Sequence, residues 1–352
     1  MSLEFSHIAY VYSTRGAKGE ARALEDVSFT APQGEITCLL GASGCGKSTL
    51  LKLAAGLLPL QEGRIALEGE VLAQPGVSPP PEARPVGLVF QDAALFPHMT
   101  LAKNIAFGLT APQIGEIEGW LARVGLGGLG KRYPHQLSGG QQQRAALARA
   151  MAPGPKVLLM DEPFASVDIV LRRSLRRECR ILLRERGTTS ILVTHDPDEA
   201  LDIADRIAVM EEGRIVQFGT PAQLYEAPLT PSVGAIFSGA QIVRATVKDG
   251  AFESAFGRWP LSCTTSDPIG EGGEVDLLVE ARALRLEPAR GGLRVRDVHP
   301  LGQRARVLLR HEGGGELTAE VPQSAADHIR TGARYSAIPD DGSLRAFPVP
   351  PA

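Results

Sequence analysis

The sequence predicts an α/β domain built on a mixed sheet, followed by a small all-β domain. Short apolar strands separated by helical segments recur over the first two thirds of the chain, as in a sheet wound with helices. One of these strands runs into a glycine-rich loop and then into a helix. Beyond about residue 236 the helical patterning stops, and short β-like runs broken by glycine pairs replace it.

The first domain begins with residues 3–31, which alternate as paired strands do. Residues 35–40 form an apolar strand, the glycine-rich loop follows, and residues 48–57 have the pattern of a helix. Further apolar strands are expected at residues 86–90, 157–160, 190–194, 206–210 and 214–218. Residues 92–152 lack strand patterning, which predicts an inserted and mostly helical subdomain.

The second domain is expected to follow a boundary near residue 235, so that the domains are residues 1–235 and 236–352. Glycine-containing turns recur between residues 249 and 342 and separate short β-like runs. That spacing favours a small barrel or sandwich.

The charge balance argues against one class of partner. A formal net charge of −3 disfavours a nucleic-acid-binding protein held by bulk charge. One basic run is the exception, and its arginines are Arg172, Arg173, Arg176, Arg177 and Arg180. Because Glu178 and Glu185 are interleaved with it at helical spacing, we interpret the run as a solvated helix face.

The cysteines and apolar runs bear on location. The four cysteines are far apart and form no Cys-x-x-Cys pair, which disfavours a zinc site and a disulfide framework and fits a reducing compartment. No apolar run reaches the ~18 residues that a membrane span needs. The N-terminus has no signal-peptide pattern. We therefore expect a cytosolic chain that can still dock on a membrane protein.

The glycine-rich loop, residues 41–48, has the pattern of a phosphate-binding loop, and its strand–loop–helix context supports that interpretation. Successive backbone N–H groups would surround the β- and γ-phosphates, Lys47 would add a cation, and Ser48 would offer a hydroxyl to Mg²⁺. The residues that we assign to this binding are Gly41, Ser43, Gly44, Cys45, Gly46, Lys47, Ser48 and Thr49.

A second phosphate-binding element is predicted at residues 137–141. Ser138 can cap a helix that strong helix formers continue. Gly139 and Gly140, followed by Gln141, have no side chains to cover the N-terminus of that helix. An anion can therefore come close to its N–H groups and positive dipole end. One chain therefore carries two phosphate-binding elements.

Four polar side chains lie at or just beyond the ends of predicted strands. Asp161 suits Mg²⁺ through water, and Glu162 is placed to orient or deprotonate an attacking water. His195 could touch the γ-phosphate and relay polarity to Glu162, and Gln91 could reach the metal or the water. The alternatives are an ordinary turn after a strand, a histidine satisfied in such a turn, and a loop amide.

These elements, taken in chain order, resemble the Walker A, Q-loop, signature, Walker B, D-loop and switch-histidine motifs of ATP-binding cassette (ABC) ATPases. The matching stretches are Gly41–Thr49, Gln91, Leu137–Gln141, Val157–Glu162, Asp168 and His195. The resemblance covers roughly residues 3–235. It implies a P-loop NTPase fold, with a RecA-like core and a helical subdomain, that takes ATP and Mg²⁺ as cofactors.

The resemblance also implies a head-to-tail homodimer in which two ATPs lie between Walker A of one subunit and the signature of the other, with Asp168 at the dimer contact. It makes Tyr12 the residue that stacks on adenine. Tyr10 alternates with Tyr12, so either ring could face the base, or a tyrosine could simply pack on the strand face. Importers often have Ser-Ala-Leu-Asp where this chain has residues 165–168, Ala-Ser-Val-Asp, which affects one hydrogen bond between subunits.

The C-terminal region resembles the TOBE-type (OB-like) β domain of ATPases from bacterial binding-protein-dependent importers, and a regulatory or dimerisation role is implied. Residues 298–302, Val-His-Pro-Leu-Gly, carry part of this likeness. The usual Arg-Pro-Glu has no clear counterpart, and Glu280-Ala281-Arg282 stands in its place.

Among importers, residues 41–47, 95–98 and 132–138 look most like ferric-iron importer ATPases, although polyamine, sulfate, molybdate and sugar importers share most of these features. The implied partners are integral membrane permease subunits and, through them, a periplasmic or lipid-anchored solute-binding protein. The implied location is the cytoplasmic face of the bacterial inner membrane. Residues 94–99 form either a groove for a permease helix or core packing of the helical subdomain.

The main alternative is a non-transport ABC ATPase. Repair members of the coiled-coil type carry long heptad arms between the two phosphate-binding motifs, and the interval in this chain is short and has none. Translation-type members usually hold two cassettes, and this chain has one. A third alternative is a regulatory protein whose C-terminal domain binds a small molecule.

Overall fold

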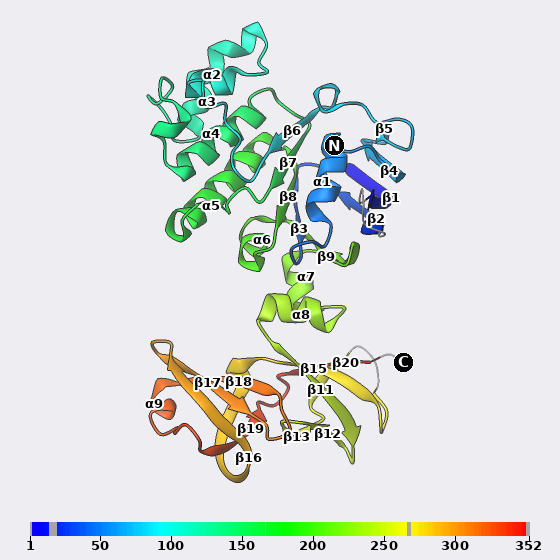
Figure 1. Cartoon of the computed structure of the whole chain (residues 1–352), viewed down its shortest axis with the longest axis vertical. Helices are drawn as coiled ribbons and strands as arrows, with labels where there is room; N and C mark the ends of the chain where they lie inside the picture. The colour runs from blue at the N-terminus through cyan, green and yellow to red at the C-terminus, as the bar shows by residue number, and fades with distance from the viewer. Residues whose placement is uncertain (1, 14–19, 166, 266–268, 350–352) are drawn as a thin grey trace. The chain divides into compact units, whose positions relative to one another are not determined.

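The computed structural model describes residues 2–13, 20–165, 167–265 and 269–349, in two compact units, Met1–Ala222 and Gln223–Ala352 (Figure 1). The sequence-based boundary near residue 235 therefore differs from the structural division. Helix α8 (Pro231–Ser238) lies with the second unit because it packs on strands β11 (Gln241–Lys248) and β15 (Glu274–Val279). Each unit has its own hydrophobic core.

The first unit begins with an antiparallel sheet in the order β2-β1-β4-β5. Its strands are β1 (Leu3–Ser13), β2 (Glu20–Ala31), β4 (Glu62–Leu67) and β5 (Glu70–Ala73). The pairing of β1 with β2 contains three register shifts, the last of them between Tyr10 and Val11. These irregularities change the simple alternation of side chains along β1.

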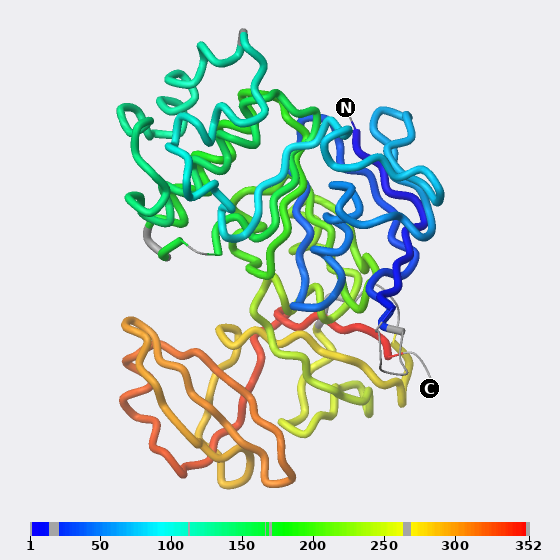
Figure 2. Tube along the Cα trace, turned by 45° about the horizontal axis from the view of Figure 1, so that its top comes forward, coloured from blue at the N-terminus to red at the C-terminus, as the bar shows by residue number. Residues whose placement is uncertain are grey.

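The second sheet of this unit has six strands in the order β10-β9-β3-β8-β7-β6. They are β3 (Ile36–Leu40), β6 (Val86–Val89), β7 (Val157–Asp161), β8 (Thr189–Thr194), β9 (Arg206–Glu211) and β10 (Arg214–Gly219). All neighbouring pairs are parallel except β9 with β10. In Figure 2 the blue β3 lies between two green strands of much later sequence, β8 and β9. Every residue of β3 and β8 is buried, as expected for central strands covered on both faces.

Helical segments alternate with the strands of this sheet along the chain, which confirms the predicted α/β fold (Figure 1). They are α1 (Lys47–Ala55), α2 (Leu101–Ala106), α3 (Ile117–Arg123), α4 (Gly139–Met151), α5 (Ile169–Arg186) and α6 (Pro197–Ile203), followed by α7 (Pro221–Glu226). Between β6 and β7 the described chain forms α2, α3 and α4 with two short 3₁₀ helices, Ala111–Glu116 and Pro134–Gln136. A further 3₁₀ turn, Pro81–Ala83, precedes β6. The expected helical insertion thus corresponds to residues 101–151.

The second unit contains two sheets. One has the order β13-β12-β11-β15-β20-β14 and the other β18-β17-β16-β19. The remaining strands are β12 (Ala251–Ser254), β13 (Gly257–Pro260), β14 (Cys263–Thr265), β16 (Leu284–Pro300), β17 (Arg304–Arg310), β18 (Glu316–Pro322), β19 (Arg334–Pro339) and β20 (Leu344–Pro348). A 3₁₀ turn, Ala281–Ala283, and a short helix, α9 (Gln323–Ala326), complete it.

The two sheets of the second unit share a single core. Phe252 and Trp259 from the first sheet belong to the same buried cluster as Val307 and Leu317 from the second. The indole N–H of the buried Trp259 donates to the carbonyl of Ala337 at 2.8 Å, so its polar atom is satisfied inside the core. The prediction of an additional all-β domain is confirmed.

Candidate active site

The glycine-rich loop joins β3 to α1 at the edge of the sheet where the parallel strands end. Gly44 and Gly46 have φ angles of 88° and 104°, which glycine adopts readily and other residues rarely do. A Cβ at Gly46 would lie 2.3 Å from the carbonyl oxygen of Ala23, so the close backbone approach also requires glycine. The loop thus combines glycines that permit a tight turn with the N-terminus of α1, which is the combination found at phosphate-binding sites.

Lys47 lies across this loop. Its ammonium donates to the carbonyls of Gly41 at 2.7 Å and Ala42 at 2.8 Å, and its Nζ lies 3.6 Å from the thiol of Cys45. The side chain is 5% exposed. A buried ammonium group beside the glycine-rich loop can donate charge-assisted hydrogen bonds to a phosphate group bound there.

A cavity of about 470 Å³ opens beside the loop. Its lining residues are Tyr12, Ala21, Arg22, Ala23, Ser43, Gly44, Gly46, Lys47, Ser48, Thr49 and Glu162. The cavity thus brings together side chains from β1, β2, the loop, α1 and the end of β7.

The two tyrosines of β1 differ in burial. Tyr10 is 7% exposed and belongs to the hydrophobic core, whereas Tyr12 is 37% exposed and lines the cavity. The rings meet edge to face with centroids 4.9 Å apart, and the Tyr12 hydroxyl lies 3.2 Å from the hydroxyl of Thr49. Of the two residues, Tyr12 borders this cavity and Tyr10 does not.

Ser48 and Asp161, two of the residues predicted to hold Mg²⁺, lie in contact with each other. The Ser48 hydroxyl donates to a carboxylate oxygen of Asp161, at the end of β7, over 3.0 Å. Burial raises the pKa of Asp161, and the bond from Ser48 opposes that shift. Two adjacent hard oxygen ligands, one of them a carboxylate that a nearby cation would keep ionised, fit a Mg²⁺ ion that retains several waters.

Glu162 is held in an unusual backbone conformation. Its φ is 44°, in the left-handed region that non-glycine residues rarely adopt. Its N–H donates to the carbonyl of Val193 over 3.0 Å, and one carboxylate oxygen lies 3.2 Å from Nδ1 of His195. The carboxylate lines the cavity, so it can accept a proton from a water bound there.

Gln91 is not brought to this cavity. It lies exposed, two residues beyond β6, and is absent from the lining residues. Its predicted contact with the metal or the water remains a prediction.

The second phosphate-binding element opens α4. The Ser138 hydroxyl accepts from the N–H of Gln141 at 3.3 Å, and the Gln141 side chain accepts from the N–H of Ser138 at 3.0 Å. This reciprocal capping box gives Gln141 a structural role that residue type alone did not indicate. Ser138 and Gly139 are exposed, Gly140 is buried, and none of residues 138–141 lines the cavity beside the phosphate loop.

Asp168 caps helix α5. One of its carboxylate oxygens accepts from the N–H of Leu171 over 3.0 Å. Leu171 also packs against the signature, since a Cβ at Gly140 would lie 2.5 Å from its Cδ2. Ser166, part of the departure from the importer pattern, lies outside the described residues.

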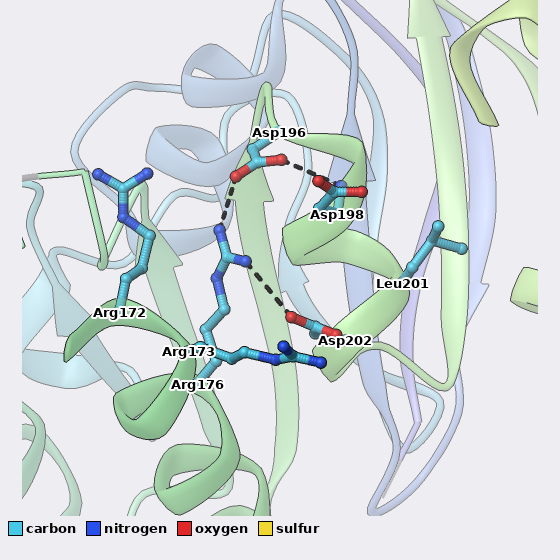
Figure 3. Close-up of a pocket in the computed structure, with 7 residues that line it drawn as sticks. All are labelled: Arg172, Arg173, Arg176, Asp196, Asp198, Leu201 and Asp202. Atoms are coloured by element: carbon cyan, nitrogen blue, oxygen red, sulfur yellow. Dashed lines mark hydrogen bonds and ion pairs between the residues drawn. The ribbon is translucent and has the colours of Figure 1, made fainter. Parts of the chain in front are cut away.

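The interpretation of the basic run as a solvated helix face is wrong for Arg176. This residue is 6% exposed, and its guanidinium pairs with Asp196 at 2.6 Å and with Glu199 at 3.4 Å. Asp202 lies 3.4 Å away on the same helix, α6 (Figure 3). The missed signal was the spacing of Asp196, Glu199 and Asp202, which puts three carboxylates on one helix face.

Arg176, Asp196 and Asp202 border a second cavity, of about 580 Å³, between α5 and α6 (Figure 3). Burial raises the pKa of Glu199 to about 7, and the charge of Arg176 opposes that shift. Burial of Asp196 also raises its pKa, but the bond from Arg176 and two backbone N–H groups outweigh burial, so the net shift is downward.

In the described part of the chain, no helix is long and apolar enough to cross a membrane.

Comparisons with known proteins identify a matching family and several similar sequences. A family described as "ABC transporter" matches residues 24–165. The sulfate/thiosulfate import ATP-binding protein CysA 2 of Chromobacterium violaceum is 43% identical over 86% of this chain and 84% of its own. In Pseudomonas fluorescens, the Fe(3+) ions import ATP-binding protein FbpC is 45% identical over 69% of this chain and 70% of its own. The spermidine/putrescine import ATP-binding protein PotA of that species is 38% identical over 90% and 88%.

A solved structure has the same fold. It is described as the dimeric structure of a post-hydrolysis state of the ATP-binding cassette MJ0796 bound to ADP and Pi, and it matches with a TM-score of 0.54 and 26% identity. The match covers 62% of this chain and 98% of that one. With 43% identity to an import ATP-binding protein across most of both sequences, this chain belongs to the ABC transporter ATPases of importer type.

Proposed function

We propose that this chain forms a head-to-tail homodimer that binds ATP with Mg²⁺ and hydrolyses it to drive solute import through a membrane permease. One observation carries the proposal. The cavity beside Lys47 and Glu162 includes none of residues 138–141, so each chain holds two half-sites on different surfaces. In the dimer, Ser138, Gly139 and Gly140 of one subunit would contact the γ-phosphate bound to Lys47 of the other.

Each residue of the half-site has a role in this proposal. Tyr12 stacks on adenine, and the loop amides with Lys47 hold the β- and γ-phosphates. Ser48 and Asp161 hold Mg²⁺, which supplies charge neutralisation of the phosphates when bound. Glu162 accepts the proton of the attacking water, and His195, at 3.2 Å, fixes the orientation of that carboxylate. Gln91 would join this set from its exposed position after β6.

The comparisons support the assembly. The solved relative is described as a dimer bound to ADP and Pi, and the curated relatives are named import ATP-binding proteins. We propose that the chain works on the cytoplasmic face of the membrane, beneath permease subunits that receive solute from a binding protein. Phe107 and Phe90 are 54% and 38% exposed. Phe96 is half-buried and its ring centroid lies 4.6 Å from that of Phe107. We propose that residues 94–99, with these neighbouring phenylalanines, form the surface for a permease helix.

A mixing experiment tests the composite site. Lys47→Ala removes one half-site, and Ser138→Asp disables the other, because Asp keeps the N-cap but directs a negative charge at the triphosphate. Each variant alone is expected to lack ATPase activity. Their mixture is expected to recover up to about a quarter of wild-type turnover, since half of the dimers would hold one intact site of two. Steady-state phosphate release measures the recovery.

The choice of Ser138 avoids a structural artefact. A side chain at Gly140 would collide with Leu171 of its own subunit, so loss of activity there would not report on the partner's nucleotide. Ser138→Thr, which keeps the cap and adds no charge, is the matched control and should remain active. If both inactive variants fold and dimerise but their mixture stays inactive, the head-to-tail arrangement is refuted.

For the solute, we propose ferric iron, supported by the likeness of residues 95–98 and 132–138 to ferric-iron importers. The sulfate/thiosulfate and polyamine relatives match about as well as the iron relative. Sulfate, thiosulfate and polyamines are therefore the alternative solutes. The test is ATPase stimulation in the complex reconstituted with its permease and binding protein. Ferric iron should stimulate turnover several-fold while sulfate and spermidine do not. Stimulation by either of the others would reassign the solute.

A further inference from the structure

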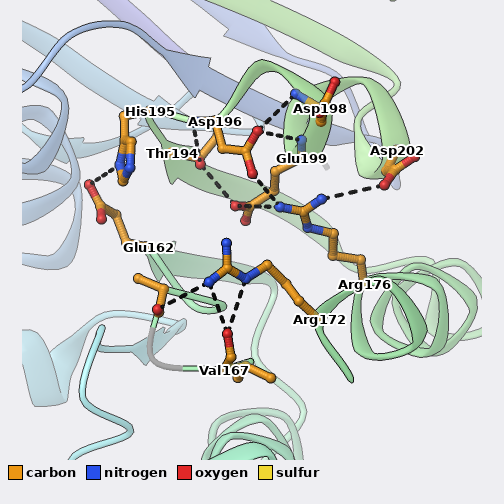
Figure 4. Close-up of polar contacts among 11 residues, drawn as sticks. Glu162, Val167, Arg172, Arg176, Thr194, His195, Asp196, Asp198, Glu199 and Asp202 are labelled. Carbon is orange, nitrogen blue, oxygen red and sulfur yellow. Dashed lines mark hydrogen bonds and ion pairs between the residues drawn. The ribbon is translucent and has the colours of Figure 1, made fainter. Parts of the chain in front are cut away.

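Helix α5 contacts the turn that precedes it through Arg172. The Nε and Nη2 atoms of Arg172 donate to the carbonyl of Val167 at 3.2 and 2.9 Å, and Nη2 donates to that of Ala165 at 3.4 Å (Figure 4). The side chain is half-buried. A planar guanidinium with several donors thus holds the backbone carbonyls of Ala165 and Val167.

One helical turn later, α5 contacts the segment that carries His195. Arg176 reaches Asp196, the neighbour of His195, at 2.6 Å and the buried Glu199 at 3.4 Å (Figure 4). Buried ion pairs of this kind are costly to break, because removing one partner leaves the other charge unpaired.

Hydrogen bonds of Thr194 connect that ion pair to the backbone next to His195. The Thr194 hydroxyl donates to Glu199 at 2.9 Å and accepts from the N–H of Asp196 at 3.0 Å. Asp196 in turn caps α6 through bonds from the N–H groups of Asp198 and Glu199. The direction in which His195 points toward Glu162 therefore depends on where Arg176 holds Asp196.

The network also has unused bonding capacity. Among the described residues, the buried Nε of Arg176 and Oε1 of Glu199 have no hydrogen-bond partner. Because this donor and this acceptor are unpaired, the guanidinium and the carboxylates could exchange hydrogen-bond partners if α5 moved.

We propose that Arg172 and Arg176 are positioning residues that couple the backbone at Ala165 and Val167 to the turn that carries His195. The inference rests on the proposed head-to-tail dimer, in which the family resemblance implies that Asp168 lies at the contact with the partner subunit. When the dimer closes, the partner subunit would displace the backbone at Ala165 and Val167. Arg172 would transmit this displacement to α5, and Arg176 would transmit it to Asp196. His195 then orients Glu162 only when the partner is in place.

A double-mutant cycle tests the coupling. Lysine keeps the charge at either position but lacks the planar fork, so Arg172→Lys and Arg176→Lys should each lower kcat about 10- to 100-fold through misplacement of His195. KM for ATP should change less than threefold, because neither residue lines the nucleotide cavity. The kcat of the double variant should be no more than about threefold below that of the more impaired single variant, because both residues act on the same turn.

Arg173→Gln is the matched control. Arg173 lies between the two on the same helix and borders the same cavity, but it is exposed (Figure 3). Its removal should leave kcat within about twofold of wild type. Asp196→Asn gives an independent check, because asparagine preserves the cap on α6 but removes the charge that Arg176 holds, and its effect should also be non-additive with Arg176→Lys.

The outcomes separate this inference from the proposed function. If wild type hydrolyses ATP but both lysine variants behave like Arg173→Gln, the positioning role is refuted. If the single-variant losses multiply in the double variant, the residues act independently and the coupling is refuted. If KM rises with little change in kcat, the arginines serve nucleotide binding instead. A wild-type chain that lacks ATPase activity as a dimer would refute the proposed function itself. Should Arg176→Lys lower the melting temperature, the half-buried Arg172 and Asp196→Asn still decide the question.

Discussion

Replacing Glu162 with Gln is expected to lower steady-state ATP turnover by about 10²- to 10⁴-fold, the range that a positioned general base contributes. Glutamine has the same shape as glutamate but cannot take a proton from the attacking water. The contact with His195 at 3.2 Å and the surrounding cavity would remain. ATP binding should therefore persist, and the variant should accumulate as an ATP-bound dimer. Phosphate release measures turnover, and gel filtration with ATP measures the dimer.

The control for this variant is Asp198→Asn. Asp198 is an exposed carboxylate in the first turn of α6, close to His195 in the chain, and it does not line the nucleotide cavity. Its neutralisation should leave turnover near that of wild type. Wild-type phosphate release by Glu162→Gln would exclude Glu162 as the base and would direct attention to His195.

Lys47→Ala is expected to weaken ATP binding by about 100-fold, because charge-assisted hydrogen bonds to a phosphate contribute roughly 1.5–3 kcal/mol and the loop loses its central cation. The substitution also leaves the carbonyls of Gly41 and Ala42 without the donor that now bonds them at 2.7 and 2.8 Å. The loop should then lose part of its shape as well as its charge. Calorimetric titration with a non-hydrolysable ATP analogue measures the affinity.

Lys52→Ala is the matched comparison for the loop lysine. Lys52 is an exposed lysine on the same helix, α1, and is absent from the cavity lining. It should retain affinity within about twofold, which would show that the effect at Lys47 is not one of overall charge. Unchanged affinity in a folded Lys47→Ala protein would contradict the assigned role of this residue.

The strand–loop–helix around Lys47 was predictable because its signals are local. A largely apolar strand, glycines that permit φ angles of 88° and 104°, and a helix rich in leucine, lysine and alanine all lie within about twenty residues. The cap by Ser138 was predictable for the same reason, since it depends on residues three positions apart. Asp161 could be placed because it ends a buried strand next to the loop.

Features that depend on distant packing could not be predicted. Alternation along β1 does not distinguish Tyr10 from Tyr12, although the family resemblance favours Tyr12. The structure separates them, because Tyr10 belongs to the core and Tyr12 borders the cavity. The arginines of α5 repeat at helical spacing whether or not a partner covers them. The carboxylate partners of Arg176 come from α6, which β8 separates from α5 in the chain. The boundary between the units shifted because α8 packs on later strands.

The left-handed backbone of Glu162 has an evolutionary consequence. A conformation with φ of 44° costs a non-glycine residue on the order of 1 kcal/mol, which glycine or asparagine would largely avoid. Selection for folding alone would therefore drive this position away from glutamate. In a related protein that no longer hydrolyses ATP, we expect this glutamate to be replaced early. The residue at this position can therefore indicate whether a paralogue still hydrolyses ATP.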